Sequence, residues 1–463
     1  MLAIVLSIIC AAPAPALALA ARAESAMVDK GAALAGYSLT LEVESRWFAS
    51  GEAEIPEGPP AFAALRSDRL ELRLDGSEAR RKVHVATPDG GVVDYQEQLG
   101  GGDAAEARAF ERTLGMFAPW LMAQITSKRF TVKATPKLAL DGRKLPALAV
   151  KTPDGLLTVA FDPDTGLPLV VRRVVSHPLR GRRMYELRYT EWRSAGPLRV
   201  PKAWTTSLGG EAIAYSTVRD ASAVKARATS GKPSDAPPAA AEADIVRAML
   251  APTGGEVGAR QWQRVSVAEG VDRLSGRAGD ILVVEMRDHL VVFDAPCAGA
   301  CADAALAELR RAYPKKPVRT LVLSHHHDAR ALGLLAFALA VDQIIVAAGA
   351  RAWTEKLLQR LPKKRRPVVL DVAPQRAITD GTRVVRLTRL VDHPHASTLI
   401  MGYVQDAKVL WAVDVAVGRD HPLHFDWNER LSRAERSLGV GASALVVDGR
   451  GSVAPHTPLA SVR

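Results

Sequence analysis

The sequence lacks the signatures of several common protein classes. It contains no Walker-type phosphate loop, no G-x-G-x-x-G that opens a helix and no G-x-S-x-G, so neither nucleotide binding nor serine hydrolysis has support. Beyond the N-terminus, no run approaches the roughly 18 uncharged apolar residues that a transmembrane helix requires. Aromatic residues are few, at 5%, but 48% of the residues are hydrophobic and 24% are charged, which argues against a disordered or fibrous chain.

Positive charge is in excess but is not concentrated. The 463 residues include 61 Lys and Arg against 50 Asp and Glu, and the net charge is +11. Because the excess is spread over the whole length, we expect no nucleic-acid partner. The dense basic block at 363–366 follows Pro362 and precedes an apolar β-type run. We interpret it as a solvated loop, with a contact to nucleic acid or an acidic membrane as the alternative.

The N-terminus has the pattern of a secretory signal. Residues 2–20 are uncharged and mostly apolar, and Ala21-Arg22-Ala23 forms an A-x-A cleavage pattern. We therefore expect a signal peptide over residues 1–23 and a periplasmic or secreted protein with no stable membrane span after its removal. The start lacks the usual Lys or Arg, which leaves a mis-assigned start codon or a membrane anchor as alternatives, although Pro13 and Pro15 would break a spanning helix.

Two cysteines remain once the signal is removed. Cys297 and Cys301 are an even pair in a compartment that we expect to be oxidising. A short-loop disulfide is one interpretation of this pair, and two free thiols in a loop that leads into a helix are the other.

The N-terminal half alternates with a period of two. Apolar and polar residues alternate from Tyr37 to Glu44, and the same period recurs up to Tyr189, whereas about residues 104–126 have a helical pattern. We expect residues 27–228 to form a curled antiparallel β half-barrel around a helix. The segments FDPDTGLPLVVRRV and YTEWRSAGPLRVPKAW resemble the periplasmic lipoprotein-carrier half-barrel. That resemblance implies a lipid on the curled sheet, and an ordinary hydrophobic core is the alternative.

The second half follows a segment rich in proline and alanine. Residues 229–243 have no periodicity and indicate a linker. Strands and helices then alternate over residues 244–463, which predicts an α/β domain whose sheets are covered by helices. The fold class is thus a two-domain α+β and α/β protein.

A histidine tract ends one of these strands. The apolar run Val318–Leu323 leads into Ser324 and then His325, His326 and His327, directly before an apolar helix. Ligands in α/β proteins bind at the carboxyl ends of strands. Residues two apart in an extended segment point to the same side, so His325 and His327 could share one metal ion while His326 points away. A surface tract that scavenges metal is the alternative.

The order of segments over residues 260–450 resembles the metallo-β-lactamase superfamily. The segments are VSVAEGVDRLSG, ILVVEMRDHLVVFDAP, KKPVRTLVLSHHHDARALGLLAF and ITDGTRVVRLTRLVDHPHASTLIMGYVQDAKVLWAVDVA. The resemblance is to the exported branch and implies an αββα sandwich that binds one or two zinc ions for hydrolysis. It implies that His325, His327 and His395 are metal ligands, and that Asp414 is the carboxylate that bridges or completes a second metal site.

The second metal site departs from this pattern. Where the family has Asp and His, this chain has Ala329 and Arg330, and neither side chain can ligate zinc. We therefore expect one zinc ion rather than two. Arg330 could project toward Asp414, supply a positive charge where relatives hold the second metal, and hold an anionic substrate group. Asp328 sits one place early for a ligand, and we expect it to cap the following helix.

Other candidate residues carry weaker signals. The last family histidine aligns with Asp448 or Arg450, depending on a two-residue register, and of these Asp448 could bind metal. His421 and His424 follow Asp414 and could contact the site. The isolated histidines are interpreted as surface or core residues: His177, His289 and His456.

The predicted function is an exported zinc-dependent hydrolase that attacks an ester, amide or phosphoester of an unknown small molecule. The alternative is a catalytically degenerate protein of the same fold that binds a lipid, peptide or other ligand. Zinc storage or a structural role is a third interpretation. The intact histidines favour the first interpretation, and the substituted Asp-His pair favours the second.

Overall fold

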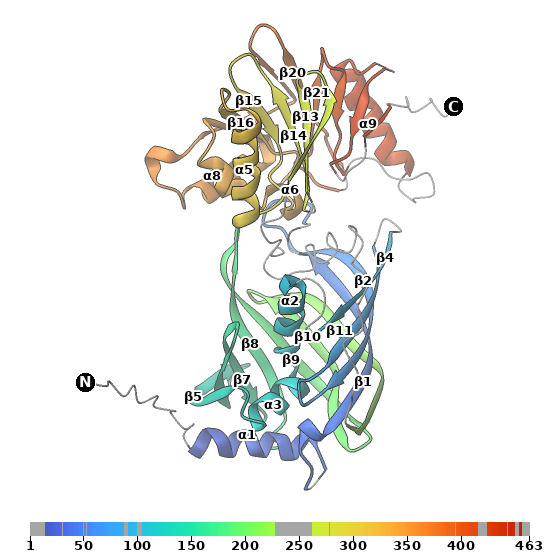
Figure 1. The fold of residues 1–463 in the computed structure, drawn as a ribbon, viewed down its shortest axis with the longest axis vertical. Helices are drawn as coiled ribbons and strands as arrows, with labels where there is room; N and C mark the ends of the chain where they lie inside the picture. The colour runs from blue at the N-terminus through green and yellow to red at the C-terminus, as the bar shows by residue number, and fades with distance from the viewer. Residues whose placement is uncertain are drawn as a thin grey trace, which may run out of the picture.

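A computed structural model describes most of the chain. The described residues are 14–29, 31–49, 51, 53–87, 91–99, 104–226, 262–276, 278–393, 395–414, 424–441, 443–449 and 453–455. The predicted linker, most of the predicted signal's apolar stretch, and His421, Arg450 and His456 lie outside them. The described residues form two sheet-based domains that lie end to end in Figure 1.

The N-terminal domain is a single 11-stranded antiparallel sheet in the order β4-β3-β2-β1-β11-β10-β9-β8-β7-β6-β5. It curls around α2 (Ala104–Leu114) and α3 (Ala118–Thr126), as Figure 1 shows. This confirms the predicted antiparallel sheet and its helical insertion. The strands are β1 (Tyr37–Ala49), β2 (Ala61–Arg73), β3 (Ala79–Ala86), β4 (Val92–Gln98), β5 (Thr131–Leu140), β6 (Arg143–Thr152), β7 (Gly155–Phe161), β8 (Pro168–His177), β9 (Gly181–Ala195), β10 (Leu198–Leu208) and β11 (Glu211–Lys225).

A further helix, α1 (Ala14–Met27), lies across the end of this sheet. Its buried residues Ala16, Ala20, Ala23 and Met27 recur at helical spacing and belong to the domain core. The helix α1 thus runs through the predicted cleavage pattern and packs against the core of the N-terminal domain. The signal peptide itself stays a prediction. Within the described part of the chain, no helix is both long enough and apolar enough to cross a membrane.

The curled sheet is filled by side chains of mixed character. The helix α3 is buried almost throughout, and Tyr189 donates a hydrogen bond to the Met116 carbonyl. Farther along the sheet, Arg66 pairs with Asp68 at 2.7 Å, and the buried Arg81 contacts Glu97. This ionic layer interrupts the apolar surface that an acyl chain would require. The lipid suggested for this domain stays a prediction.

The C-terminal domain has two sheets between layers of helices. The first sheet contains β12 (Gln263–Ala268), β13 (Val271–Gly276), β14 (Gly279–Glu285), β15 (Leu290–Phe293), β16 (Val318–Val322), β17 (Gln343–Ala347) and β18 (Val368–Val372). The second contains β19 (Gln375–Thr379), β20 (Val384–Arg389), β21 (Ile400–Val404), β22 (Val409–Trp411), β23 (Leu445–Val447) and β24 (Val453–Pro455). The helices are α5 (Ala300–Ala312), α6 (Asp328–Ala331), α7 (Leu334–Ala338), α8 (Arg351–Leu358) and α9 (His424–Leu438).

Three hydrophobic clusters hold these layers together. One joins the first sheet to α5, α7 and α8, a second lies between the sheets around Phe293 and Trp411, and a third joins the second sheet to α9. This layering is the predicted αββα sandwich. Cys297 and Cys301 form a disulfide at the start of α5, so the first of the two interpretations of this pair holds.

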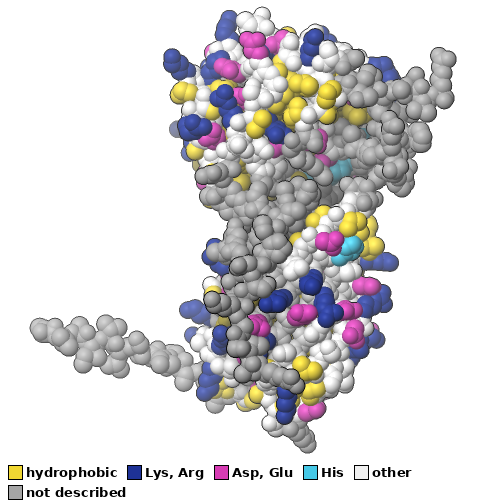
Figure 2. Space-filling view, turned by 45° about the vertical axis from the view of Figure 1, so that its right-hand side comes forward, with side chains coloured by type: hydrophobic (Ala, Val, Ile, Leu, Met, Phe, Trp, Pro, Cys, Tyr) yellow, Lys and Arg dark blue, Asp and Glu magenta, His cyan; other side chains and the backbone are white. Residues whose placement is uncertain are grey.

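Charged side chains are mixed on the surface. On the face in Figure 2, Lys and Arg are interspersed with Asp and Glu over both domains. The dense basic block forms a 3-10 turn, Lys363–Arg365, that has no buried residue. This arrangement agrees with the solvated loop inferred from the sequence.

Candidate metal centre

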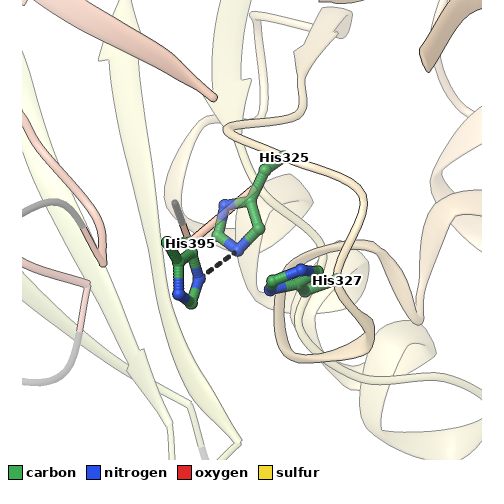
Figure 3. Close-up of side chains that lie close together, drawn as sticks. All are labelled: His325, His327 and His395. Atoms are coloured by element: carbon green, nitrogen blue, oxygen red, sulfur yellow. Dashed lines mark hydrogen bonds between the residues drawn. The ribbon is translucent and has the colours of Figure 1, made fainter. Parts of the chain in front are cut away.

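Three histidines from two separate segments meet in the C-terminal domain. His325 and His327 lie in the loop after β16, and His395 lies between β20 and β21. One ligand atom from each side chain lies within 4.8 Å of the other two, and Figure 3 shows the rings gathered together. His325 and His327 are buried, and His395 is half-buried. The structure thus brings together the three residues that the sequence singled out.

The spacing of the nitrogens suits one metal ion. The Nε2 atoms of His325 and His395 lie 3.3 Å apart, and the ring centres of the trio are 4.6–5.0 Å apart. Two nitrogen ligands of a tetrahedral zinc ion, each about 2.0–2.1 Å from the metal, lie roughly 3.3–3.4 Å from each other. The distance between the His325 and His395 nitrogens therefore already matches that of two ligands of one zinc ion.

Hydrogen bonds determine which nitrogen His327 offers. Its Nε2 lies 2.9 Å from the carbonyl oxygen of Ala53. A carbonyl oxygen only accepts hydrogen bonds, so Nε2 carries the ring hydrogen and the lone pair is on Nδ1. His325 has its Nδ1 3.1 Å from the Ser324 hydroxyl and turns Nε2 toward His395. His325 and His327 thus each have one outer partner, as metal-binding histidines usually do.

The surroundings of His325 favour its neutral form. Burial lowers the pKa of His325 well below its usual value, and the neighbouring His327 and His395 lower it further. A neutral imidazole has the lone pair that a metal requires. His326 points away from the trio, as expected, with Nδ1 2.6 Å from the Thr398 hydroxyl. Burial lowers the pKa of His326 to about 3.

Arg330 and Asp414 form a buried ion pair beside the histidines. Arg330 donates from Nε to Asp414 Oδ2 at 3.0 Å and from Nη1 to the Gly449 carbonyl at 3.0 Å. The same carboxylate oxygen is 3.7 Å from His325 Nε2. Both side chains are nearly inaccessible to solvent, at 3% and 6% exposed. A guanidinium therefore lies against the carboxylate that the resemblance assigns to a second metal ion.

Neither carboxylate proposed as a metal ligand joins the trio. Among the described residues, the converging group contains the three histidines without Asp414 or Asp448. Asp414 is bound by Arg330 instead, and Arg330 also contacts the backbone of Gly449, next to Asp448. The expected ligand roles of Asp414 and Asp448 stay predictions. His424 is the first residue of α9.

Asp328 does not cap the following helix, so that prediction was wrong. It is the first residue of α6, and no side chain caps this helix. Its carboxylate accepts from Arg180 at 2.7 Å and lies 3.1 Å from His177 Nε2. Burial would raise the pKa of Asp328, but Arg180 and His177 hold it well below its usual range. His177, predicted to be an isolated core or surface residue, is buried in a contact between the domains.

Asp294 is a site residue that the sequence reasoning missed. Fully buried after β15, it accepts from the Ser324 backbone at 2.7 Å and the Ser324 hydroxyl at 2.9 Å. Trp411 also donates to this carboxylate, at 3.3 Å. Burial raises the pKa of Asp294 to about 6 against the opposing effect of Arg330. Its signal in the sequence is an acidic residue directly after a continuous apolar strand.

Comparison with known proteins identifies the class of this domain. The sequence profile of the metallo-beta-lactamase superfamily matches residues 274–449. The C-terminal half of the chain therefore belongs to the metallo-beta-lactamase superfamily. No protein of curated function matches the chain.

Solved structures are similar to part of the chain. A metallo-beta-lactamase from Pontibacter korlensis is 15% identical, with a TM-score of 0.34, over 43% of this chain and 95% of that one. The metallo-beta-lactamase DIM-1 is 16% identical, with a TM-score of 0.33, over 42% and 92%. The stereoselective inverting sec-alkylsulfatase Pisa1 from Pseudomonas sp. is 15% identical, with a TM-score of 0.32, over 45% and 40%.

Proposed function

We propose that this protein is an exported hydrolase that uses a single zinc ion held by His325, His327 and His395. The observation that carries the proposal is the convergence of three imidazoles, with two of their nitrogens 3.3 Å apart. Zinc bound by three histidines keeps a fourth position open, acts as a Lewis acid and activates water at neutral pH. The proposed substrates are small molecules with an ester, amide or phosphoester bond.

Arg330 would bind the anionic part of the substrate. Its guanidinium is a permanent charge beside the histidines, held by Asp414 and the Gly449 carbonyl. Charged donors that are fixed before the substrate arrives stabilise negative charge that develops on an oxygen atom. The pair would therefore position a substrate oxygen near the histidines.

The residues at positions 329 and 330 also predict slow hydrolysis. Ala329 and Arg330 occupy the positions where the family has Asp and His, so a group that orients the attacking water is missing. General-base assistance commonly contributes about 10²–10⁴ in rate. We propose that hydrolysis is slower than in relatives with the Asp-His pair by a factor of this order.

Metal analysis of the purified full chain is the first test. After exposure to zinc and removal of excess metal, the wild type should retain about one equivalent, in line with a single three-histidine site. His395→Ala should retain none, whereas His84→Ala, on the exposed outer face of β3, should match the wild type. A wild type that retains no metal would remove the basis of the proposal.

Activity is the second test. The zinc-loaded protein should hydrolyse members of a panel of ester, amide and phosphodiester substrates, and a chelator should abolish that activity. Retained zinc together with flat rates across the panel would favour the alternative of a ligand-binding protein.

A further inference from the structure

The loop between β1 and β2 extends from the N-terminal domain to the histidine segments. Its residues Gly51 and Ala53 are buried. The Gly51 carbonyl accepts from the backbone N–H of Asp328 at 3.2 Å, and the Glu54 carbonyl accepts from that of Ser397 at 2.9 Å. One loop of the other domain therefore joins the segment that contains His325 and His327 to the segment that contains His395.

The Ala53 carbonyl lies at the centre of this contact. Its oxygen is 2.8 Å from Nε2 of His326 and 2.9 Å from Nε2 of His327. A carbonyl oxygen has two lone pairs and can accept from both rings at once. Both rings must then carry their hydrogen on Nε2. In His326 the Nδ1 atom accepts from the Thr398 hydroxyl. In His327 the lone pair is then on Nδ1.

A second turn of the N-terminal domain reinforces the contact. The turn between β8 and β9 places Leu179 in the hydrophobic cluster of the C-terminal domain. On either side of it, His177 and Arg180 bind the carboxylate of Asp328, the residue that follows His327. Arg360 of the C-terminal domain donates to the Leu179 carbonyl at 3.1 Å. The two turns thus hold the backbone next to His327 from two directions.

We propose that the N-terminal domain is a working part of the metal centre, with Ala53 as a positioning residue whose carbonyl fixes the ring orientation and tautomer of His327. The inference rests on the proposed function only in that zinc is the metal used to test it. Outer hydrogen bonds to metal-binding histidines typically change metal affinity about 10–100-fold. The affinity of the C-terminal domain for metal therefore depends on a contact that its own sequence does not contain.

Gly51 provides the variant that tests this contact. A Cβ atom at this position would overlap Asp328 Oδ2 and lie 2.9 Å from Asp328 Cβ, so Gly51→Ala must displace either the loop or the Asp328 side chain that it contacts. Gly36→Ala is the matched control, because a Cβ atom there meets nothing within 4 Å. Arg180→Gln is a second variant, which removes an ion pair to Asp328 without adding a clash.

Zinc affinity of the full chain is measured by competition with a chromophoric chelator. Gly51→Ala should raise the Kd about 10–100-fold and Arg180→Gln should raise it less, whereas Gly36→Ala should leave it unchanged. Circular dichroism should show that all three variants are folded. Folded Gly51→Ala and Arg180→Gln variants with the Kd of the wild type would overturn the inference.

The tautomer of His327 in the metal-free protein separates this inference from the proposed function. Ring nitrogen NMR, assigned by loss of signal in His327→Gln, should show the hydrogen on Nε2 in the wild type and in Gly36→Ala, and a mixture of tautomers in Gly51→Ala. A wild type that binds no zinc would overturn the proposed function and leave the NMR result to decide the inference. A hydrogen on Nδ1 of His327 in the wild type would overturn the inference, whatever the protein binds.

Discussion

The histidine trio and the Arg330–Asp414 pair are adjacent groups of buried polar side chains, but they differ in how their polar atoms are compensated. The trio gathers imidazole nitrogens, and a neutral imidazole has a lone pair that suits a cation. The neighbouring pair already contains its cation, a guanidinium bonded to the carboxylate at 3.0 Å. A permanent charge can replace the electrostatic role of a metal ion but not its Lewis acidity. On the proposed function, the centre would keep the Lewis acidity of one metal position and only the positive charge of the other.

Restoring Asp and His at positions 329 and 330 should remove the difference between the two halves of the centre, and we expect the largest change in zinc content and activity from it. Ala329→Asp combined with Arg330→His returns the Asp-His pair next to Asp414. Zinc bound per chain should rise from one ion to two, and hydrolysis should rise by about 10²–10⁴ if the missing group is a general base. Elemental analysis and the substrate panel measure both effects. Arg330→His alone is the control, and a double variant that still binds one ion would contradict the expectation.

Removing the built-in cation should destabilise the fold. Arg330→Met leaves the carboxylate of Asp414 buried at 6% exposure without its guanidinium. Breaking a buried ion pair from one side typically costs about 3–5 kcal/mol in the free energy of unfolding. The matched control is Arg319→Met, which breaks a half-exposed pair with Asp288 and should cost about 0–1 kcal/mol. Urea unfolding measures both, and equal losses would show that the buried pair has no special weight.

The free energy of unfolding should depend on pH through the buried His326, which lies next to the trio. Because burial lowers the pKa of His326 to about 3, the unfolded chain, whose histidines titrate near 6.5, takes up the proton first as pH falls. The free energy of unfolding should therefore decline below pH 6.5 by up to about 1.4 kcal/mol per pH unit from this residue. In metal-free protein, His326→Gln should reduce the decline between pH 6.5 and 5, whereas His84→Gln should not. A decline of unchanged slope in His326→Gln would refute this.

Many strands of both domains could be predicted because strands produce a local periodicity of apolar residues in the sequence. Alternation from Tyr37 onward predicted strands of the curled sheet, and apolar runs such as Val318–Leu323 predicted the buried strands of the sandwich. The packing of α1 against the core of the N-terminal domain was not predicted. Residues 14–27 match both a secretory signal and an amphipathic helix, and packing against the core is visible only in the fold.

The candidate site was predictable where side chains carry the signal. His325, His327 and His395 are residue types that bind metals, and a guanidinium at residue 330 had an obvious carboxylate partner in Asp414. Asp328 was misassigned because a carboxylate before a helix usually caps it, and its true partners lie about 150 residues away in the sequence. Ala53 left no signal at all, since it acts through its backbone.

Local periodicity and residue chemistry were therefore enough to predict the two-domain fold, many of its strands and the three histidines that converge, because both can be read from short stretches of sequence. Three features could be seen only in the folded protein. They are the ring nitrogen of His327 that carries the hydrogen, the charged partners of Asp328, and the loop that contacts the histidine segments. These features depend on backbone atoms, which every residue has in common, and on contacts between segments far apart in the chain. Such contacts are set by where the atoms lie in the fold and not by the type of residue that carries them.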